Sequence, residues 1–335
     1  MWSPQRCLGP AEMKIGVTSW VWPDHSFDEV LAACTNLGIE HLELACGGFF
    51  PPHNCDARAL LGDPAALREA RERLEQSSIT ISALAVHGEP LHPDPTISTA
   101  YAGDLDRAIE LAHELGVVNL TLLAGLPEAA EGDRSPNWVT YPYPARNLQV
   151  MSWQWEQRLL PYWRERVERA DQAGVRFCFE IHPADMLHQP SRLLRLRDEL
   201  GPTVGANLDP SHLIWQGADL VEVVHTLGDA IYNVHAKESE LNEAVVRRDG
   251  VIDGRTFAKP SERSWSFRTI GYGQSVHWWR KLLSALRSVG YDGVLAYEHE
   301  DPLFDPDEGL RRGLELLRSS VPLLPQTPMW YEETE

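Results

Sequence analysis

The sequence predicts a single (β/α)8 barrel of the TIM type, in the α/β class. Three observations lead to this prediction. Short apolar segments alternate with amphipathic ones, several apolar segments follow a glycine, and there are eight such units, the number that closes a barrel. An open doubly wound sheet with an extra strand is the alternative. No GxGxxG motif follows the first apolar segment, so the dinucleotide-binding form of that open sheet lacks its main signal.

The predicted strands are rich in β-branched and apolar residues. Gly38, Gly116 and Gly174 precede three of them, as expected where a helix ends. We place the eight strands at 14–20, 39–45, 79–87, 117–125, 175–182, 204–212, 231–239 and 293–301.

The helices between the strands follow from apolar residues at helical spacing. Segment 63–77 repeats Leu and Ala in this way and has Asp63 at its N-cap position. The same pattern predicts helices at 104–116, 155–174, 277–290 and 307–320.

Two connections are too long for simple loops. One runs from Leu126 to about Trp153 after the fourth strand, and the other from Leu241 to about Gly273 after the seventh. In a barrel both would lie at the C-terminal mouth, where insertions form substrate walls or lids. The expected domain organisation is a leader or flexible N-terminus at 1–12, the catalytic barrel at 13–320 and a C-terminal tail at 321–335.

Composition excludes some classes of function. The 335 residues carry a formal net charge of −19, whereas a nucleic-acid-binding protein needs a basic surface. No apolar run reaches the roughly 18 residues of a membrane span. The five cysteines show no CxxC spacing, so we interpret them as reduced thiols in a cytoplasmic protein.

Charged residues follow the apolar part of four consecutive strands. In a barrel the C-terminal strand ends surround the active site, so Glu180, Asp209, His235 and Glu298 are expected to face one another. Each residue alone is compatible with a solvated strand end, but four in register indicate a metal site. Three carboxylates and one imidazole suit Mn²⁺, with Mg²⁺ or Co²⁺ as alternatives.

A divalent ion that chelates a carbonyl and a neighbouring hydroxyl assists removal of a proton from the adjacent carbon. The candidates for the base are Glu180, Glu298, His182 and His212. Lys237 shares a strand face with His235 and would polarise an oxygen or balance charge.

The strand ends also carry a family resemblance. FEIHP, NLDPSH, VHAKE and YEHED resemble the sugar isomerase/epimerase group of xylose-isomerase-like barrels, over essentially all of 13–320. The resemblance implies one divalent ion, commonly Mn²⁺, held by Glu180, Asp209, His235 and Glu298. It also implies that His182 and His212 touch the substrate. In the ketose 3-epimerases of this group, two metal-bound glutamates that match Glu180 and Glu298 exchange the proton.

One branch of this group is more similar still. WVTYPYP (138–144), SWQWEQRLLPYW (152–163), NLDPSHLIWQG (207–217) and SWSFRTIGYGQSVHWW (264–279) resemble the branch that includes the larger, catalytic subunits of bacterial C-glycoside deglycosidases. Those enzymes remove the C2 proton of 3-oxo-glucosides and expel an aromatic aglycone by β-elimination. The resemblance implies this chemistry and a small β-type partner subunit. Lys237 stands where ketose epimerases usually carry arginine.

The tryptophans point the same way, because aromatic walls suit a flat aglycone. The chain has 12 tryptophans, and Trp138, Trp153, Trp155 and Trp265 fall in or beside the two insertions, although the same rings could simply pack the insertions against the barrel. The residues expected to bind substrate are His87, Trp138, Trp215 and Glu300.

Several other functions compete with a lyase. A ketose isomerase or 3-epimerase would form a homo-oligomer around a small polar pocket, and an inosose-type dehydratase stands between the two. A barrel without chemistry, acting as a scaffold, conflicts with the full ligand set. A zinc-dependent DNA-repair endonuclease shares the fold, but the negative charge disfavours it.

Overall fold

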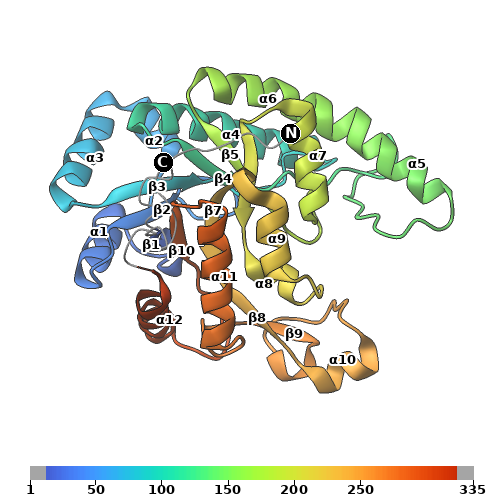
Figure 1. The fold of residues 1–335 in the computed structure, drawn as a ribbon. Coiled ribbons are helices and arrows are strands. Elements are labelled where there is room, and N and C mark those ends of the chain that lie inside the picture. Colours follow the sequence, from blue (N-terminus) through green and yellow to red (C-terminus); the bar gives the residue numbers. More distant parts are fainter. Residues whose placement is uncertain (1–12, 323–335) are drawn as a thin grey trace, which may run out of the picture.

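Eight parallel strands close into a barrel, as predicted (Figure 1). The computed structural model describes residues 13–322, so the expected leader and almost all of the expected tail lie outside the described residues. Around the barrel the order is β1, β10, β7, β6, β5, β4, β3 and β2, and β2 pairs with β1 to complete the ring. The strands are β1 (Lys14–Thr18), β2 (His41–Ala45), β3 (Thr80–Ala85), β4 (Asn119–Leu122), β5 (Arg176–Glu180), β6 (Val204–Leu208), β7 (Ile231–Ala236) and β10 (Val294–Tyr297).

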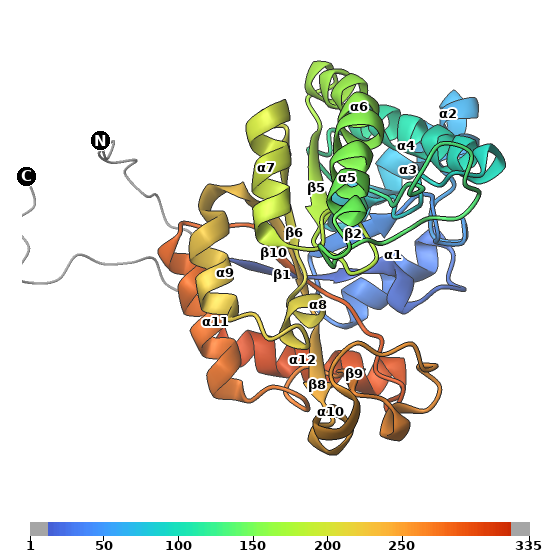
Figure 2. The ribbon, with the colours of Figure 1, turned by 90° about the vertical axis from the view of Figure 1, so that its right-hand side faces the viewer.

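Helices form the outer layer of the barrel (Figure 2). They are α1 (Phe27–Asn36), α2 (Ala57–Gly62), α3 (Pro64–Ser77), α4 (Pro95–Leu115), α5 (Arg146–Trp153), α6 (Leu160–Gln172), α7 (Pro190–Leu200), α8 (Pro210–Ile214), α9 (Leu220–Leu227), α10 (Glu243–Asp249), α11 (Val276–Ser288) and α12 (Pro306–Ser320). Short 3₁₀ turns are η1 (Ser19–Val21), η3 (Gly228–Ala230) and η4 (Pro260–Glu262), and η2 (Gln154–Leu159) is a π-helical turn that joins α5 to α6.

Two helices begin earlier than the sequence patterns indicate. α4 starts at Pro95, where the side chain of Asp94 accepts a hydrogen bond from the amide of Thr96. β-branched residues and Gly103 weaken the helical pattern over this first part, which hid the start. The other helix, predicted from 155, starts at Arg146 as α5, so the first insertion is a loop followed by two helical turns.

The second insertion forms a small sheet of its own. The seventh barrel strand ends at Ala236, and Glu238 begins β8 (Glu238–Leu241), which pairs antiparallel with β9 (Trp265–Arg268). This sheet and α10 stand off from the barrel beside α8 in both views (Figures 1 and 2). The buried Glu238 carboxylate fixes the base of the insertion, because it accepts hydrogen bonds from Gly273 N at 2.5 Å and Trp279 Nε1 at 2.5 Å.

The core is apolar between the barrel and the helices, whereas the barrel interior also holds buried polar side chains such as Glu43, Asn207 and Asn233. Between barrel and helices, Trp163 lies fully buried against Phe177 and Phe179.

The four described cysteines are buried and free. Among the described residues, no helix combines the length and apolar character needed to cross a membrane.

Candidate functional site

The four predicted metal ligands come together at the C-terminal end of the barrel. Glu180 ends β5, His235 lies near the end of β7, and Asp209 and Glu298 directly follow β6 and β10. His235 Nδ1 lies 3.1 Å from Glu180 Oε2 and 3.0 Å from Glu298 Oε2. Ligand atoms of Glu180, Asp209 and His235 all lie within 4.8 Å of one another. The geometry thus brings the predicted set into one buried cluster.

Two oxygens of this cluster make no hydrogen bond, although His212 Nε2 lies 3.2 Å from Asp209 Oδ2 and His235 Nδ1 lies 3.0 Å from Glu298 Oε2. Asp209 Oδ2 and Glu298 Oε2 are buried and accept no hydrogen bond from the described residues. Leaving such atoms without a partner is costly, and a cation would satisfy both. The residues therefore fit a divalent metal ion.

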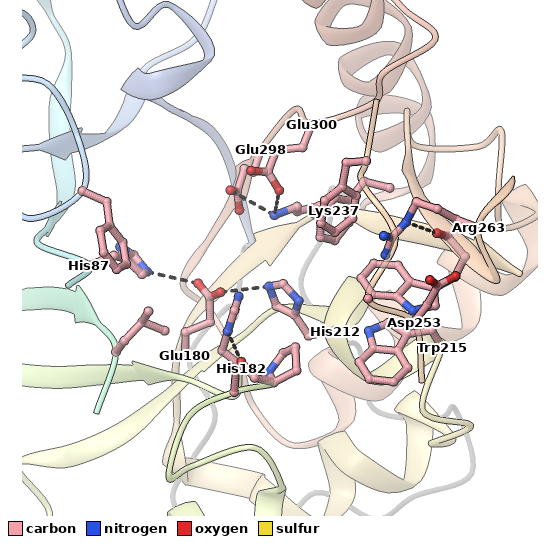
Figure 3. Close-up of a pocket in the computed structure, with 18 of the residues that line it drawn as sticks. His87, Glu180, His182, His212, Trp215, Lys237, Asp253, Arg263, Glu298 and Glu300 are labelled. Atoms are coloured by element: carbon pink, nitrogen blue, oxygen red, sulfur yellow. Dashed lines mark hydrogen bonds and ion pairs between the residues drawn. The ribbon is translucent and has the colours of Figure 1, made fainter. Parts of the chain in front are cut away.

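Glu180 lies between His87 and His212 in the pocket (Figure 3). His87 Nε2 lies 3.1 Å from Glu180 Oε2, and His212 Nε2 lies 3.0 Å from Glu180 Oε1. Burial opposes the ionisation of Glu180, but hydrogen bonds from the surrounding histidines outweigh it and hold its pKa well below the usual range. Glu180, His182 and His212 also form a second group with metal-ligand spacing.

His182 has a ring nitrogen without a hydrogen-bond partner among the described residues, as His87 and His212 do at Nδ1. The Nδ1 of His182 lies 2.5 Å from the carbonyl oxygen of Pro183, which can only accept, so Nδ1 carries the proton and Nε2 keeps its lone pair. Nε2 has no hydrogen-bond partner among the described residues, and the side chain lines the pocket. Burial and the neighbouring His212 lower the pKa of His182 to about 3, so its imidazole is neutral at neutral pH.

Lys237 connects the carboxylate–imidazole cluster to the predicted Glu300. Its Nζ lies 3.1 Å from Glu298 Oε1 and 2.5 Å from Glu300 Oε2. Although burial opposes its charge, these carboxylates raise the pKa of Lys237 well above the usual range. Lys237 is therefore a buried cation at the edge of the cluster, where it balances carboxylate charge.

A cavity of about 680 Å³ opens in front of the cluster. The four residues expected to bind substrate, His87, Trp138, Trp215 and Glu300, all line it.

Trp153 and Trp155 follow the packing alternative and do not wall the pocket. Neither residue lines the cavity. Trp155 is 1% exposed and donates to Glu199 Oε1 at 3.0 Å, whereas Trp153 lies under Arg158. Both belong to the long helix that continues into α6, so their rings pack that helix instead of walling the pocket.

Sequence reasoning missed Trp20, Glu43 and Asn207, which contact the cluster. Asn207 Nδ2 donates to Glu180 Oε2 at 3.0 Å. Trp20 follows β1 and donates its indole N–H to Glu298 Oε1 at 3.1 Å. Glu43 in β2 is fully buried, and its Oε1 lies 3.0 Å from His235 Nε2. The one available signal for Glu43 was a carboxylate in the middle of the apolar segment HLELA.

Glu43 orients His235. Because Glu43 accepts the Nε2 proton, His235 Nδ1 is left to face Glu180 and Glu298 as a ligand atom. Asn233 Nδ2 donates to the other Glu43 oxygen at 2.8 Å, and Thr121 Oγ1 donates to Oε1 at 2.5 Å. Together these bonds fix the imidazole at the floor of the site.

Replacing Glu43 with Gln is expected to weaken Mn²⁺ binding about tenfold or more, because an outer partner of a histidine ligand typically contributes 10–100-fold. Titration calorimetry with Mn²⁺ measures the effect. Glu128→Gln is the matched control, since Glu128 is also buried but bonds Arg158 away from the cluster. An unchanged Mn²⁺ affinity in Glu43→Gln would contradict this role.

Comparison with known proteins agrees with this architecture. Residues 31–320 match the family model described as the xylose isomerase-like TIM barrel. The chain is 33% identical over 298 residues to the uncharacterized protein YfiH of Bacillus subtilis (strain 168), a match that covers 88% of this chain and 95% of YfiH.

Solved structures share the fold at low sequence identity. The 3-keto-D-glucoside 4-epimerase YcjR from E. coli is 16% identical with a TM-score of 0.62, covering 92% of this chain and 100% of that chain. The probable 3-DHS dehydratase AsbF from Bacillus anthracis is 16% identical with a TM-score of 0.63, covering 91% and 99%. These two likenesses concern the fold alone. With its closed barrel and a family match over most of its length, the chain belongs to the xylose isomerase-like TIM barrel family.

Proposed function

We propose that the protein is a metal-dependent enzyme that removes the proton next to the carbonyl of an oxidised sugar or glycoside. Family membership supports an enzyme that modifies a sugar. One observation carries the proposal further. A single pocket joins a buried carboxylate–imidazole cluster that fits a divalent cation to a neutral imidazole, His182, whose Nε2 is unused.

Glu180, Asp209, His235 and Glu298 would hold the ion, for which Mn²⁺ is the first choice on ligand chemistry. When bound, such an ion supplies a Lewis acid for a carbonyl oxygen. The protein's own part is proton transfer and orientation. His182 Nε2 accepts the proton from the carbon next to the carbonyl, and Lys237 places positive charge at the same end of the cavity.

The finer assignment is a lyase that cleaves the 3-oxo-glycoside of an aromatic aglycone. In this step the C2–H electron pair forms a C1=C2 double bond as the bond from C1 to the aglycone breaks. The aglycone keeps that bond's electron pair and takes up a proton. The cavity of about 680 Å³ supports a substrate of this kind, because it lies within the roughly 300–1,000 Å³ of pockets that enclose drug-sized ligands.

A second candidate is an epimerase or isomerase on a keto sugar, and an inosose-type dehydratase is a third. The fold neighbours support the second, since one is named a 3-keto-D-glucoside 4-epimerase. The lyase, epimerase and dehydratase reactions all begin with loss of a proton beside a carbonyl. The carboxylate–imidazole cluster and His182 could therefore serve each of them.

Incubation with Mn²⁺ and an aromatic 3-oxo-C-glucoside in D₂O separates the candidates. We expect release of the aglycone, measured by chromatography, with loss of the C2 proton. Deuterium at C4, or a C4 epimer without release, would support the epimerase instead. A sample that loses no activity after chelation of its metal would rule out all three candidates.

We infer a cytoplasmic protein whose barrel domain spans 13–320 and which acts with a small β-type subunit. A homo-oligomer is the assembly that the epimerase alternative predicts.

A further inference from the structure

The pocket has a second polar wall that the proposed chemistry does not use. Arg263 lines the cavity from the insertion between β8 and β9. In Figure 3 Arg263 and Trp215 lie together on the side of the cavity opposite His87, with Glu180 between them and His87. The metal cluster and this wall therefore contact different parts of any ligand that fills the cavity.

The Arg263 guanidinium is held in one orientation. Its central carbon lies 3.9 Å from the ring centroid of Phe257 and 4.9 Å from that of Trp265. Its Nε donates to the carbonyl oxygen of Trp265 at 3.1 Å, and its Nη1 donates to the carbonyl oxygen of Arg255. With two rings and two backbone oxygens around it, the group is pre-organised at little further entropic cost on binding.

The charge of Arg263 has no carboxylate partner. The residue is 1% exposed, yet among the described residues no carboxylate oxygen lies within the 4.0 Å of an ion pair. The carboxylate of the nearby Asp253 forms an ion pair with Arg255 Nε at 2.8 Å and accepts a hydrogen bond from the amide of Ser264 at 2.6 Å.

Burying a cation without a counter-charge is unfavourable. Burial accordingly lowers the pKa of Arg263 from its ordinary value. Arg263 Nη2 also makes no hydrogen bond within the described part of the chain, although it belongs to a side chain that lines the cavity. An oxyanion from the ligand would satisfy both the charge and this donor.

We propose that Arg263 forms a subsite for a carboxylate on the part of the ligand remote from the sugar. The neighbouring indoles of Trp215 and Trp265 are parallel, with centroids 4.9 Å apart, and give the subsite an aromatic wall. For a glycoside substrate this inference rests on the proposed function, and it specifies the aglycone as an aromatic acid.

The test uses two probes without sugar, naphthalene-2-carboxylate and its neutral isostere naphthalene-2-carboxamide. Calorimetric titration of the metal-stripped protein removes binding of the carboxylate to the metal cluster. We expect the carboxylate to bind about tenfold tighter than the amide, in line with a charge-assisted hydrogen bond. Arg263→Gln should reduce this preference to about twofold or less.

Arg195→Gln is the matched control, because Arg195 also stacks on a tryptophan, Trp155, but lies outside the cavity. It should keep the full preference. Equal binding of the two probes to the wild type, or no binding of either, overturns the proposal whatever the variants do. So does an Arg263→Gln protein that folds, by its circular dichroism, and still prefers the carboxylate.

Should Arg263→Gln fail to fold, Arg263→Met, which keeps much of the side chain's length without its charge, replaces it, and an unchanged carboxylate preference in that variant also overturns the proposal. Because neither metal nor sugar is present, this result does not depend on the proposed reaction. Loss of the reaction without loss of the carboxylate preference would refute the proposed function alone.

Discussion

Glu180→Gln is expected to abolish turnover and to weaken Mn²⁺ binding by at least about 100-fold, the upper end of what outer-shell partners contribute. The carboxylate of Glu180 contacts more side chains of the site than a single ion pair would require. It lies within 3.1 Å of His87, His212 and His235, and Asn207 donates to its Oε2 at 3.0 Å. Glutamine keeps the shape but removes the negative charge that a divalent cation needs.

The measurements are Mn²⁺ titration by calorimetry and the rate of aglycone release. Glu222→Gln on the exposed face of α9 makes the same chemical change away from the pocket and should leave both quantities unchanged. A Glu180→Gln protein that binds Mn²⁺ like the wild type would show that the ion, if any, sits elsewhere.

That the four predicted ligands lie together was predictable, because this needs only strand ends. In a parallel barrel every C-terminal strand end lies at the same mouth, so Glu180, Asp209, His235 and Glu298 could be grouped without knowing which strands are neighbours. The grouping required only that the eight strands be found, and their order around the barrel did not matter.

Glu43 and Trp20 needed information that a sequence pattern lacks. Glu43 contacts His235 across the barrel interior, and this contact depends on closure of β1 onto both β10 and β2. Nothing local to HLELA tells which strand its carboxylate faces.

Arg263 was missed for another reason. It lies in an insertion with no periodic pattern. Its guanidinium is notable because no carboxylate pairs with it among the described residues, and this can be seen only once the nearby carboxylates have been placed in three dimensions. Trp153 and Trp155 could not be assigned from the sequence, because aromatic residues suit both a pocket wall and helix packing.

His182→Ala is expected to reduce turnover by about 10²–10⁴-fold, the usual contribution of a positioned acid or base, while Mn²⁺ affinity changes by less than about threefold. This separation follows from the hydrogen bonds. His182 uses Nδ1 on a backbone carbonyl and is not needed to complete the Glu180–Asp209–His235 group. His225→Ala, on the exposed side of α9, is the matched control.

The same variant decides which residue takes the proton. Glu180 already accepts hydrogen bonds on both oxygens and Glu298 accepts one from Trp20 on Oε1, whereas His182 offers a nitrogen lone pair that no described residue uses. If His182→Ala binds Mn²⁺ normally and no longer exchanges the substrate C2 proton with D₂O, His182 is the base. If exchange continues at the wild-type rate and only aglycone release slows, a glutamate of the cluster removes the proton and His182 acts on the leaving group instead. Comparing the two rates in one experiment therefore assigns proton removal to the imidazole or to the carboxylates, which a loss of overall activity alone could not do.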